Sequence, residues 1–589
     1  MKLRLISILL AAVLAQACTT APRQPAEPAP PASSAPAPAK PAPRPAPKAA
    51  PPASEARPSA DLDEELLYYL LAGEIAGQRR QYAVAADMYL KAAERSDDPQ
   101  IAARAARVAV YAGDDARALQ AARRWLELEP DSVDAAQVMA VMLLRQDRID
   151  DALPYLDKVL AHPSAGPGQP DGTMLVTSLL SKEKQPERAL KTMRKLVDRH
   201  PGDAKLIYAY AHLAMLLGKL ELAERIVNQV LSGAPDMIDA YLLRANILSR
   251  LGRDEAALQF IADAVARWPK EPRLRLFYAR KLVDMKRYAE AREQFGRLLA
   301  QQPQMVDAIY ALGLLNLQLR EPDKARGYFE RLIEAGQRYD EANYYLGQAW
   351  EMAKRYDKAI EHYREVRQGD LYVDARIRIA RLQAEQGDIT AARQTLQNVN
   401  APTLDGELRL YLAEGDILTR AGRYQDAWDV YTLALQQMPD NPQLLYARAL
   451  VAERLDRLDE ALADLEKMVK ANPEDPEALN ALGYTLVDRT HRVEEGMKLI
   501  RKAYAKRPDD PAIMDSMGWA WYRLGEPEKA LEFLQKAWHR FPDAEIGAHL
   551  GEVLWVLGRQ EEARRIWQEA RQREPKNPVL LHTLERFGQ

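Results

Sequence analysis

Small residues recur along this chain at a nearly constant spacing, and this spacing restricts the fold more than any other feature of the sequence. Ala223, Ala257 and Ala291 lie 34 residues apart, and the same register runs from Ala85 to Ala563 with short departures. The full set is Ala85, Ala118, Ala152, Ala189, Ala223, Ala257, Ala291, Ala325, Ala359, Ala392, Ala427, Ala461, Gly496, Ala530 and Ala563. A fixed period of this length indicates an array of similar units that grows in one dimension, because each unit buries its apolar face on its neighbours.

The residues around each of these positions predict two helices per period. A second small residue lies twelve positions earlier in most units, as Ala211 does before Ala223, and two helices approach closely only where both carry small side chains. A large apolar residue lies four positions later, as Phe295 does after Ala291, so both face the same side of the second helix. A proline such as Pro235 follows twelve positions later in most units and ends that helix.

This pattern resembles the tetratricopeptide repeat (TPR), whose period is 34 residues. The expected fold is all-α: a right-handed superhelical solenoid of about fifteen TPR helix pairs over residues 61–575, with a C-terminal capping helix over 576–589. Only 28 glycines and 7% aromatic residues are consistent with a chain that is nearly all helix. Residues 162–172 and 400–406 interrupt the period; we interpret the first as a surface insertion and leave open that it is a hinge.

The N-terminus has the three parts of a secretory signal over residues 1–17. Two basic residues precede an apolar run, and small residues follow it. The single cysteine of the chain, Cys18, comes next, in a context similar to a bacterial lipobox, although Ala15 stands where that pattern has a branched apolar residue. We expect Cys18 to be the lipid attachment site, with plain cleavage after Ala17 as the alternative. Thr19 favours the outer membrane, facing the periplasm.

Residues 18–60 are rich in proline and alanine and predict a disordered, extended tether. The first 58 residues carry seven Lys and Arg against two acidic residues, so the body is more acidic than the net charge of −3 for the whole chain. An acidic body without a basic stripe argues against nucleic acid as a partner. We expect contact with the membrane through the N-terminal lipid only.

The sequence favours a binding protein over an enzyme. It contains no phosphate-binding loop, no nucleophile elbow and no His-Glu-x-x-His or Cys-x-x-Cys motif. No two of its eight histidines are four residues apart, so a helix-borne metal pair is absent, and we expect no catalytic residue, metal or cofactor. His549, with Glu545 and Glu552 nearby, is interpreted as a solvated or packing residue rather than a ligand.

The predicted binding surface is the concave face, which first helices of the repeats form through their second, fifth, ninth, twelfth and thirteenth residues. Tyr, Trp and Arg are enriched among anchors of protein interfaces. The residues expected there are Tyr208, His212, Asn246, Arg250, Tyr310, Tyr344, Gln348, Tyr446, Asn480, Tyr484, Asp515, Trp519, Tyr522, Arg523 and Trp555. Packing between repeats is the alternative role for each of them.

Three strings near the C-terminus carry a closer resemblance: Asn480-Ala-Leu-Gly-Tyr-Thr-Leu-Val-Asp, Asp515-Ser-Met-Gly-Trp-Ala-Trp-Tyr-Arg-Leu-Gly and Ala548-His-Leu-Gly-Glu-Val-Leu-Trp. Together with the lipobox and the tether, they resemble a family of Gram-negative outer-membrane TPR lipoproteins. The resemblance implies a periplasmic scaffold that binds and activates a carboxyl-terminal processing serine protease and presents peptidoglycan hydrolases to it. The alternative is a scaffold for assembly of an envelope export, exopolysaccharide or pilus machine.

Overall fold

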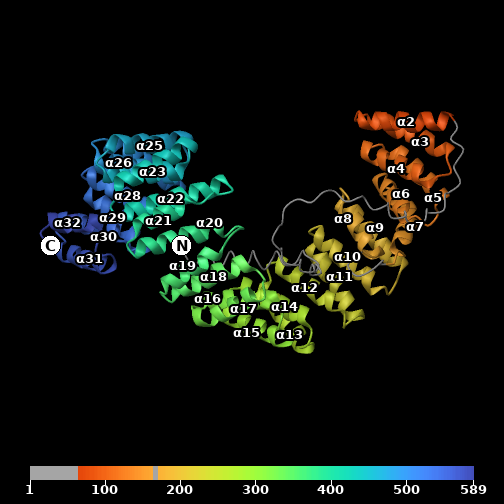
Figure 1. Cartoon of the computed structure of the whole chain (residues 1–589), viewed down its shortest axis with the longest axis horizontal. Helices are drawn as coiled ribbons and strands as arrows, with labels where there is room; N and C mark the ends of the chain where they lie inside the picture. The colour runs from red at the N-terminus through yellow and green to blue at the C-terminus, as the bar shows by residue number, and fades with distance from the viewer. Residues whose placement is uncertain (1–63, 164–169) are drawn as a thin grey trace, which may run out of the picture. The chain divides into compact units, whose positions relative to one another are not determined.

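The computed structural model describes residues 64–163 and 170–589, and within these ranges every regular element is an α-helix (Figure 1). The signal peptide, Cys18 and the tether expected from the sequence lie outside the described residues. The chain divides into two compact units, Met1–Leu319 and Arg320–Gln589. The division falls between the two helices of one repeat, and not at residues 162–172.

The helices of the first unit pair in chain order. They are α2 (Glu64–Gln78), α3 (Tyr82–Arg95), α4 (Pro99–Ala112), α5 (Asp115–Leu128), α6 (Val133–Arg145), α7 (Ile149–Leu160), α8 (Gly172–Ser181), α9 (Pro186–Arg199), α10 (Ala204–Leu216), α11 (Leu220–Gly233), α12 (Ile238–Arg250), α13 (Asp254–Arg267), α14 (Pro272–Asp284), α15 (Tyr288–Gln301) and α16 (Val306–Gln318).

The second unit continues the same order. Its helices are α17 (Pro322–Glu334), α18 (Tyr339–Met352), α19 (Tyr356–Glu365), α20 (Tyr372–Glu385), α21 (Ile389–Gln397), α22 (Leu404–Arg420), α23 (Tyr424–Gln437), α24 (Pro442–Arg454), α25 (Leu458–Ala471), α26 (Pro476–Arg489), α27 (Val493–Lys506), α28 (Pro511–Arg523), α29 (Pro527–Arg540), α30 (Ala544–Val556), α31 (Gln560–Arg573) and α32 (Pro578–Arg586). Counted in chain order, the described helices from α2 to α31 make fifteen repeats of two helices each, which confirms the predicted repeat architecture, and α32 follows them.

Local sequence explains where the first helices of the later repeats begin. An Asp or Asn precedes a Pro at the starts of α24, α26 and α28, as in Asn441-Pro442 and Asp510-Pro511. The Asn441 side chain accepts hydrogen bonds from the backbone N–H groups of Gln443 and Leu444 at 3.0 and 3.1 Å. The proline occupies the first helical position, where a missing N–H costs nothing. Both signals therefore fix the register at which each repeat starts.

The small residues that set the period are the points of closest approach between helices. Ala223, Ala257 and Ala291 have no solvent exposure, and the other members of that set are buried as well. At Gly347 in α18 a Cβ atom would lie 2.6 Å from the Tyr363 ring of α19, so only glycine fits there. The core is accordingly a continuous series of helix contacts within each unit, in which each helix packs mainly on its neighbours in the sequence.

Candidate functional site: an inner groove in the last four repeats

First helices of successive repeats lie side by side in the second unit, α26 next to α28, α28 next to α30 and α30 next to α32. A groove of about 830 Å³ opens along α24, α26, α28 and α30. Four of the residues predicted for the concave face line it: Tyr446, Asn480, Tyr484 and Asp515. We call this space the inner groove.

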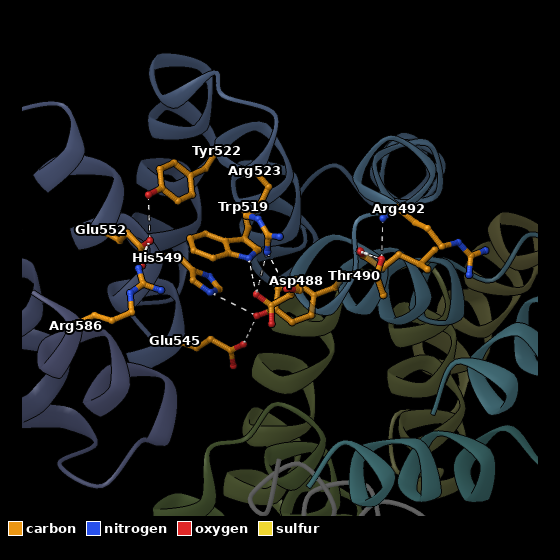
Figure 2. A network of polar contacts seen from close by, with 12 residues as sticks. Asp488, Thr490, Arg492, Trp519, Tyr522, Arg523, Glu545, His549, Glu552 and Arg586 are labelled. Atoms are coloured by element: carbon orange, nitrogen blue, oxygen red, sulfur yellow. Dashed lines mark hydrogen bonds and ion pairs between the residues drawn. The ribbon is translucent and has the colours of Figure 1, made fainter. Parts of the chain in front are cut away.

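A buried histidine lies at the centre of the polar contacts beside this groove (Figure 2). The imidazole of His549 stacks on the Trp519 indole with ring centroids 4.1 Å apart. Its Nδ1 lies 3.0 and 3.1 Å from the two carboxylate oxygens of Asp515. Burial lowers the pKa of His549, but the charge and hydrogen bond of Asp515, together with the charges of Glu545 and Asp488, outweigh burial and raise that pKa to about 9. His549 therefore carries a proton that it donates to Asp515, and the pair is a buried ion pair.

Tyr484 connects two repeats that are not adjacent in the sequence. Its hydroxyl, on α26, donates a hydrogen bond to Glu545 Oε1 on α30 at 2.9 Å. Burial raises the pKa of Glu545, and the nearby His549 charge partly opposes that shift. Burial likewise raises the pKa of Tyr484 well above its ordinary value, so the phenol stays protonated and acts as a donor.

A second hollow of about 550 Å³ lies along α26, α28, α30 and α32, and Trp519 is one of its lining residues. The Trp519 Nε1–H donates to Asp488 Oδ1 at 2.9 Å, and Arg523 Nη1 donates to the Asp488 backbone carbonyl at 2.8 Å (Figure 2). The Tyr522 hydroxyl donates to Glu552 Oε1 at 3.1 Å, and burial raises the pKa of Tyr522 to about 12. Arg586 of α32 pairs with the same Glu552 carboxylate.

These contacts divide the predicted residues of the last four repeats by exposure. Asp515 and Trp519 are each 6% exposed, because most of their surface is buried against neighbouring repeats. Tyr446 is 43% exposed, and Arg523 is also exposed. Tyr446 and Arg523 therefore offer surface to a partner, whereas Trp519 and Asp515 hold the wall of the groove in place.

The remaining predicted residues of the second unit are packed against other parts of the chain rather than lining the groove. Tyr344 is buried, and its hydroxyl accepts a hydrogen bond from Arg378 Nε at 3.0 Å. Gln348 is buried one turn further along α18. Trp555 stacks on Trp567 with centroids 5.5 Å apart. None of these three lines the inner groove.

The residues predicted in the first unit lie on α10, α12 and α16. Tyr208 and His212 are half-buried and stack at 6.3 Å, and burial lowers the pKa of His212. Asn246 and Arg250 are exposed, and Arg250 donates a hydrogen bond to the Met215 carbonyl at 3.0 Å. Tyr310 is buried. Partner contact through any of these five residues stays a prediction.

Sequence reasoning missed several residues of the groove. Glu453 is the twelfth residue of α24 and Asp488 the thirteenth of α26, the positions that Tyr522 and Arg523 occupy in α28. The positional rule could therefore have found both. They were not selected because the prediction favoured aromatic and Arg side chains. His549 was expected to be solvated or packed, and its 2% exposure shows that it is packed. An enclosed imidazole without surface cannot contact a substrate.

No group of three or more potential metal ligands occurs within residues 64–163 and 170–589. Among the helices of these same ranges, none combines the length and the apolar character that a membrane span requires.

Paired helices, a polar and aromatic inner groove and a wall held by ion pairs define a repeat scaffold of the type that binds other proteins. Comparison with family models agrees: models described as tetratricopeptide repeat match residues 103–170, 180–247, 279–340, 310–372, 351–413 and 431–576. The chain belongs to the tetratricopeptide repeat family. Such proteins are generally non-catalytic scaffolds for protein–protein interaction.

Two relatives and one solved structure are similar to this chain. The TPR repeat-containing protein PA4667 of Pseudomonas aeruginosa is 33% identical over 492 residues, which cover 83% of this chain and 82% of that protein. Cellulose synthase operon protein C of Pseudomonas fluorescens is 25% identical over 46% of this chain and 23% of its own length. A crystal structure of a tetratricopeptide repeat protein from Parabacteroides merdae matches 44% of this chain and 97% of its own at 17% identity, with a TM-score of 0.34.

Proposed function

We propose that this protein is a lipid-anchored periplasmic adaptor at the outer membrane, which binds and activates a carboxyl-terminal processing serine protease and presents substrates such as peptidoglycan hydrolases to it. Cys18 is the proposed lipid attachment site, and residues 18–60 are the proposed tether. In this role the chain resembles LbcA, the lipoprotein partner of the protease CtpA. The protein supplies no catalytic group and acts by bringing two partners together.

The observation that carries this proposal is the inner groove in the second unit. Its wall is held by contacts between repeats, such as the His549–Asp515 ion pair at 3.0 Å, while Tyr446 remains exposed for a partner. A preformed wall lowers the entropy cost of binding. A long repeat array also has room for two separate partners, and holding both on one frame raises their effective concentration.

A second candidate function is a scaffold for an envelope export or exopolysaccharide machine. The similarity to cellulose synthase operon protein C favours it, although that match covers only 23% of the relative.

Reconstitution distinguishes the two functions. A purified carboxyl-terminal processing protease is incubated with a peptidoglycan hydrolase, with and without the purified full chain in detergent, and cleavage is followed by gel electrophoresis. We expect cleavage about tenfold faster or more with the chain present, because tethering replaces a bimolecular encounter. A detergent-only sample is the control. Equal rates in both tubes would reject the adaptor function and leave the export scaffold as the better candidate.

A further inference from the structure

The inner groove combines exposed apolar surface with acidic groups. Three of its lining side chains are large and exposed: Tyr446 at 43%, Leu450 at 45% and Phe541 at 57%. Isolated exposed apolar residues are ordinary, but three that share one concavity are typical of a binding surface. The volume of about 830 Å³ also falls within the range of ligand pockets.

Two carboxylates among the lining residues of this space make no direct ion pair. Glu453 on α24 accepts a hydrogen bond from the Thr485 hydroxyl at 3.0 Å, and Glu545 on α30 accepts one from the Tyr484 hydroxyl at 2.9 Å. In the part of the chain that the structure describes, neither carboxylate has an ion-pair partner within 4 Å. Burial raises the pKa of both groups, and the charges of Arg489 and Arg454 near Glu453 and of His549 near Glu545 oppose only part of that rise. Their ionised forms therefore lose more hydration than these cations replace.

The other charged groups of the groove leave its net charge negative. Asp515 is neutralised by His549, and Asp543 caps α30 by accepting a hydrogen bond from the Glu545 N–H at 2.8 Å. Arg489 lies 3.6 Å from Asp456, which is not a lining residue. Asp488 and the exposed Arg454 balance each other in charge.

A ligand that complements both the exposed apolar surface and the negative charge of the groove has an apolar stem and a cationic end. Lys and Arg side chains have this form, since their methylene chains cover apolar surface while the charged group stays near anions. An aromatic ring such as that of Tyr446 adds a cation–π contribution.

We propose that the inner groove binds a basic, extended segment of a partner protein, which inserts a Lys or Arg side chain alongside Tyr446 and toward the carboxylates of Glu453 and Glu545. The inference rests on the proposed role of the chain as a protein-binding scaffold, but not on the identity of any protease. Charge complementarity selects the occupant.

The test is direct binding to the purified full chain, measured by fluorescence anisotropy. The probe is a fluorescein-labelled peptide of Gly, Ser and Arg, and its neutral twin carries citrulline in place of every Arg. We expect the Arg peptide to bind more tightly than its twin, with an affinity that falls as salt is added. The double variant Glu453→Gln and Glu545→Gln should weaken binding of the Arg peptide by about tenfold or more. Gln keeps the acceptor oxygen for Thr485 and Tyr484, so the fold is retained, which thermal unfolding checks.

The control is a variant with the same change in net charge outside the groove, Glu528→Gln and Glu532→Gln, which are exposed on α29. This variant should bind like the wild type. Equal weakening in both variants, or equal affinity for the Arg peptide and its twin, would overturn the proposal. So would binding that appears only after Lys40, Arg44, Lys48 and Arg57 are replaced by Gln, because the occupant would then be the chain's own N-terminal segment. The peptide-binding assay contains no protease, so its outcome is independent of the outcome of the protease reconstitution.

Discussion

Single residues of the inner groove show how a side chain selected as a partner anchor can be a structural support. Trp519 was predicted from its type and helix position, and it has both of its polar and apolar features occupied by this chain: Nε1 by Asp488 and its face by His549. Its contact with a partner stays a prediction. Substituting Trp519 would therefore change stability and binding together, which is why the binding test uses Glu453 and Glu545.

The His549–Asp515 pair makes stability depend on pH. Folding raises the pKa of His549 from an ordinary 6.5 to about 9, so the folded chain keeps a proton that the unfolded chain releases. The contribution is fully present below pH 6.5 and is lost as pH rises through 9. We expect the free energy of unfolding to fall over this window in the wild type, and to fall less in His549→Gln. Urea unfolding followed by tryptophan fluorescence measures both proteins, and equal pH dependence in the two would contradict the ion pair.

At the scale of helices, glycine and alanine decide how closely two elements of a repeat approach. Gly551 of α30 faces the Trp567 ring of α31, and a Cβ atom there would overlap the indole. Gly327 of α17 is also inside a helix, but a Cβ atom there would meet nothing within 4 Å. The same substitution should therefore have opposite effects at these two sites.

We expect Gly551→Ala to destabilise the second unit by about 1–3 kcal/mol through overpacking, although alanine is the better helix former. Gly327→Ala should stabilise it by about 0.5–1 kcal/mol, because it only removes backbone freedom from the unfolded chain. Denaturant unfolding of both variants measures whether each substitution raises or lowers the free energy of unfolding. A stabilised Gly551→Ala protein would show that α30 and α31 do not pack as closely as described.

On the scale of the whole molecule, stability is a sum of local terms, since helices contact mainly their neighbours in the sequence. A chain that ends at Pro508 lacks α28 to α32 and should keep its earlier repeats helical. The apolar cluster that joins Leu479, Ile500 and Ala520 would be cut, so α26 and α27 should fray. Circular dichroism should show a mean residue ellipticity close to that of the full chain. Loss of the whole helical signal would mean that the array folds as one cooperative unit.

The sequence by itself determined the helix pairs, because the information for them is local. The 34-residue period, the small residues and the Asp/Asn-Pro starts act within one repeat or between adjacent repeats, where a few residues decide packing. The resemblance to the TPR assigned the binding face to the first helices of the repeats. Its positional rule selected Tyr446, Asn480, Tyr484 and Asp515, and all four line one groove.

The tertiary structure alone decided which of these residues support the groove and which remain free. Tyr484 on α26 and Glu545 on α30 are 61 residues apart, and their side chains meet although the repeat of α28 separates them in the sequence. Residue type gives no signal for such a contact, since it depends on where each side chain is directed after the helices pack. For the same reason, the exposure of Tyr446 and the burial of Trp519 could not be separated in sequence: both are aromatic residues at inner positions, and only the surrounding repeats determine how much of each ring meets solvent.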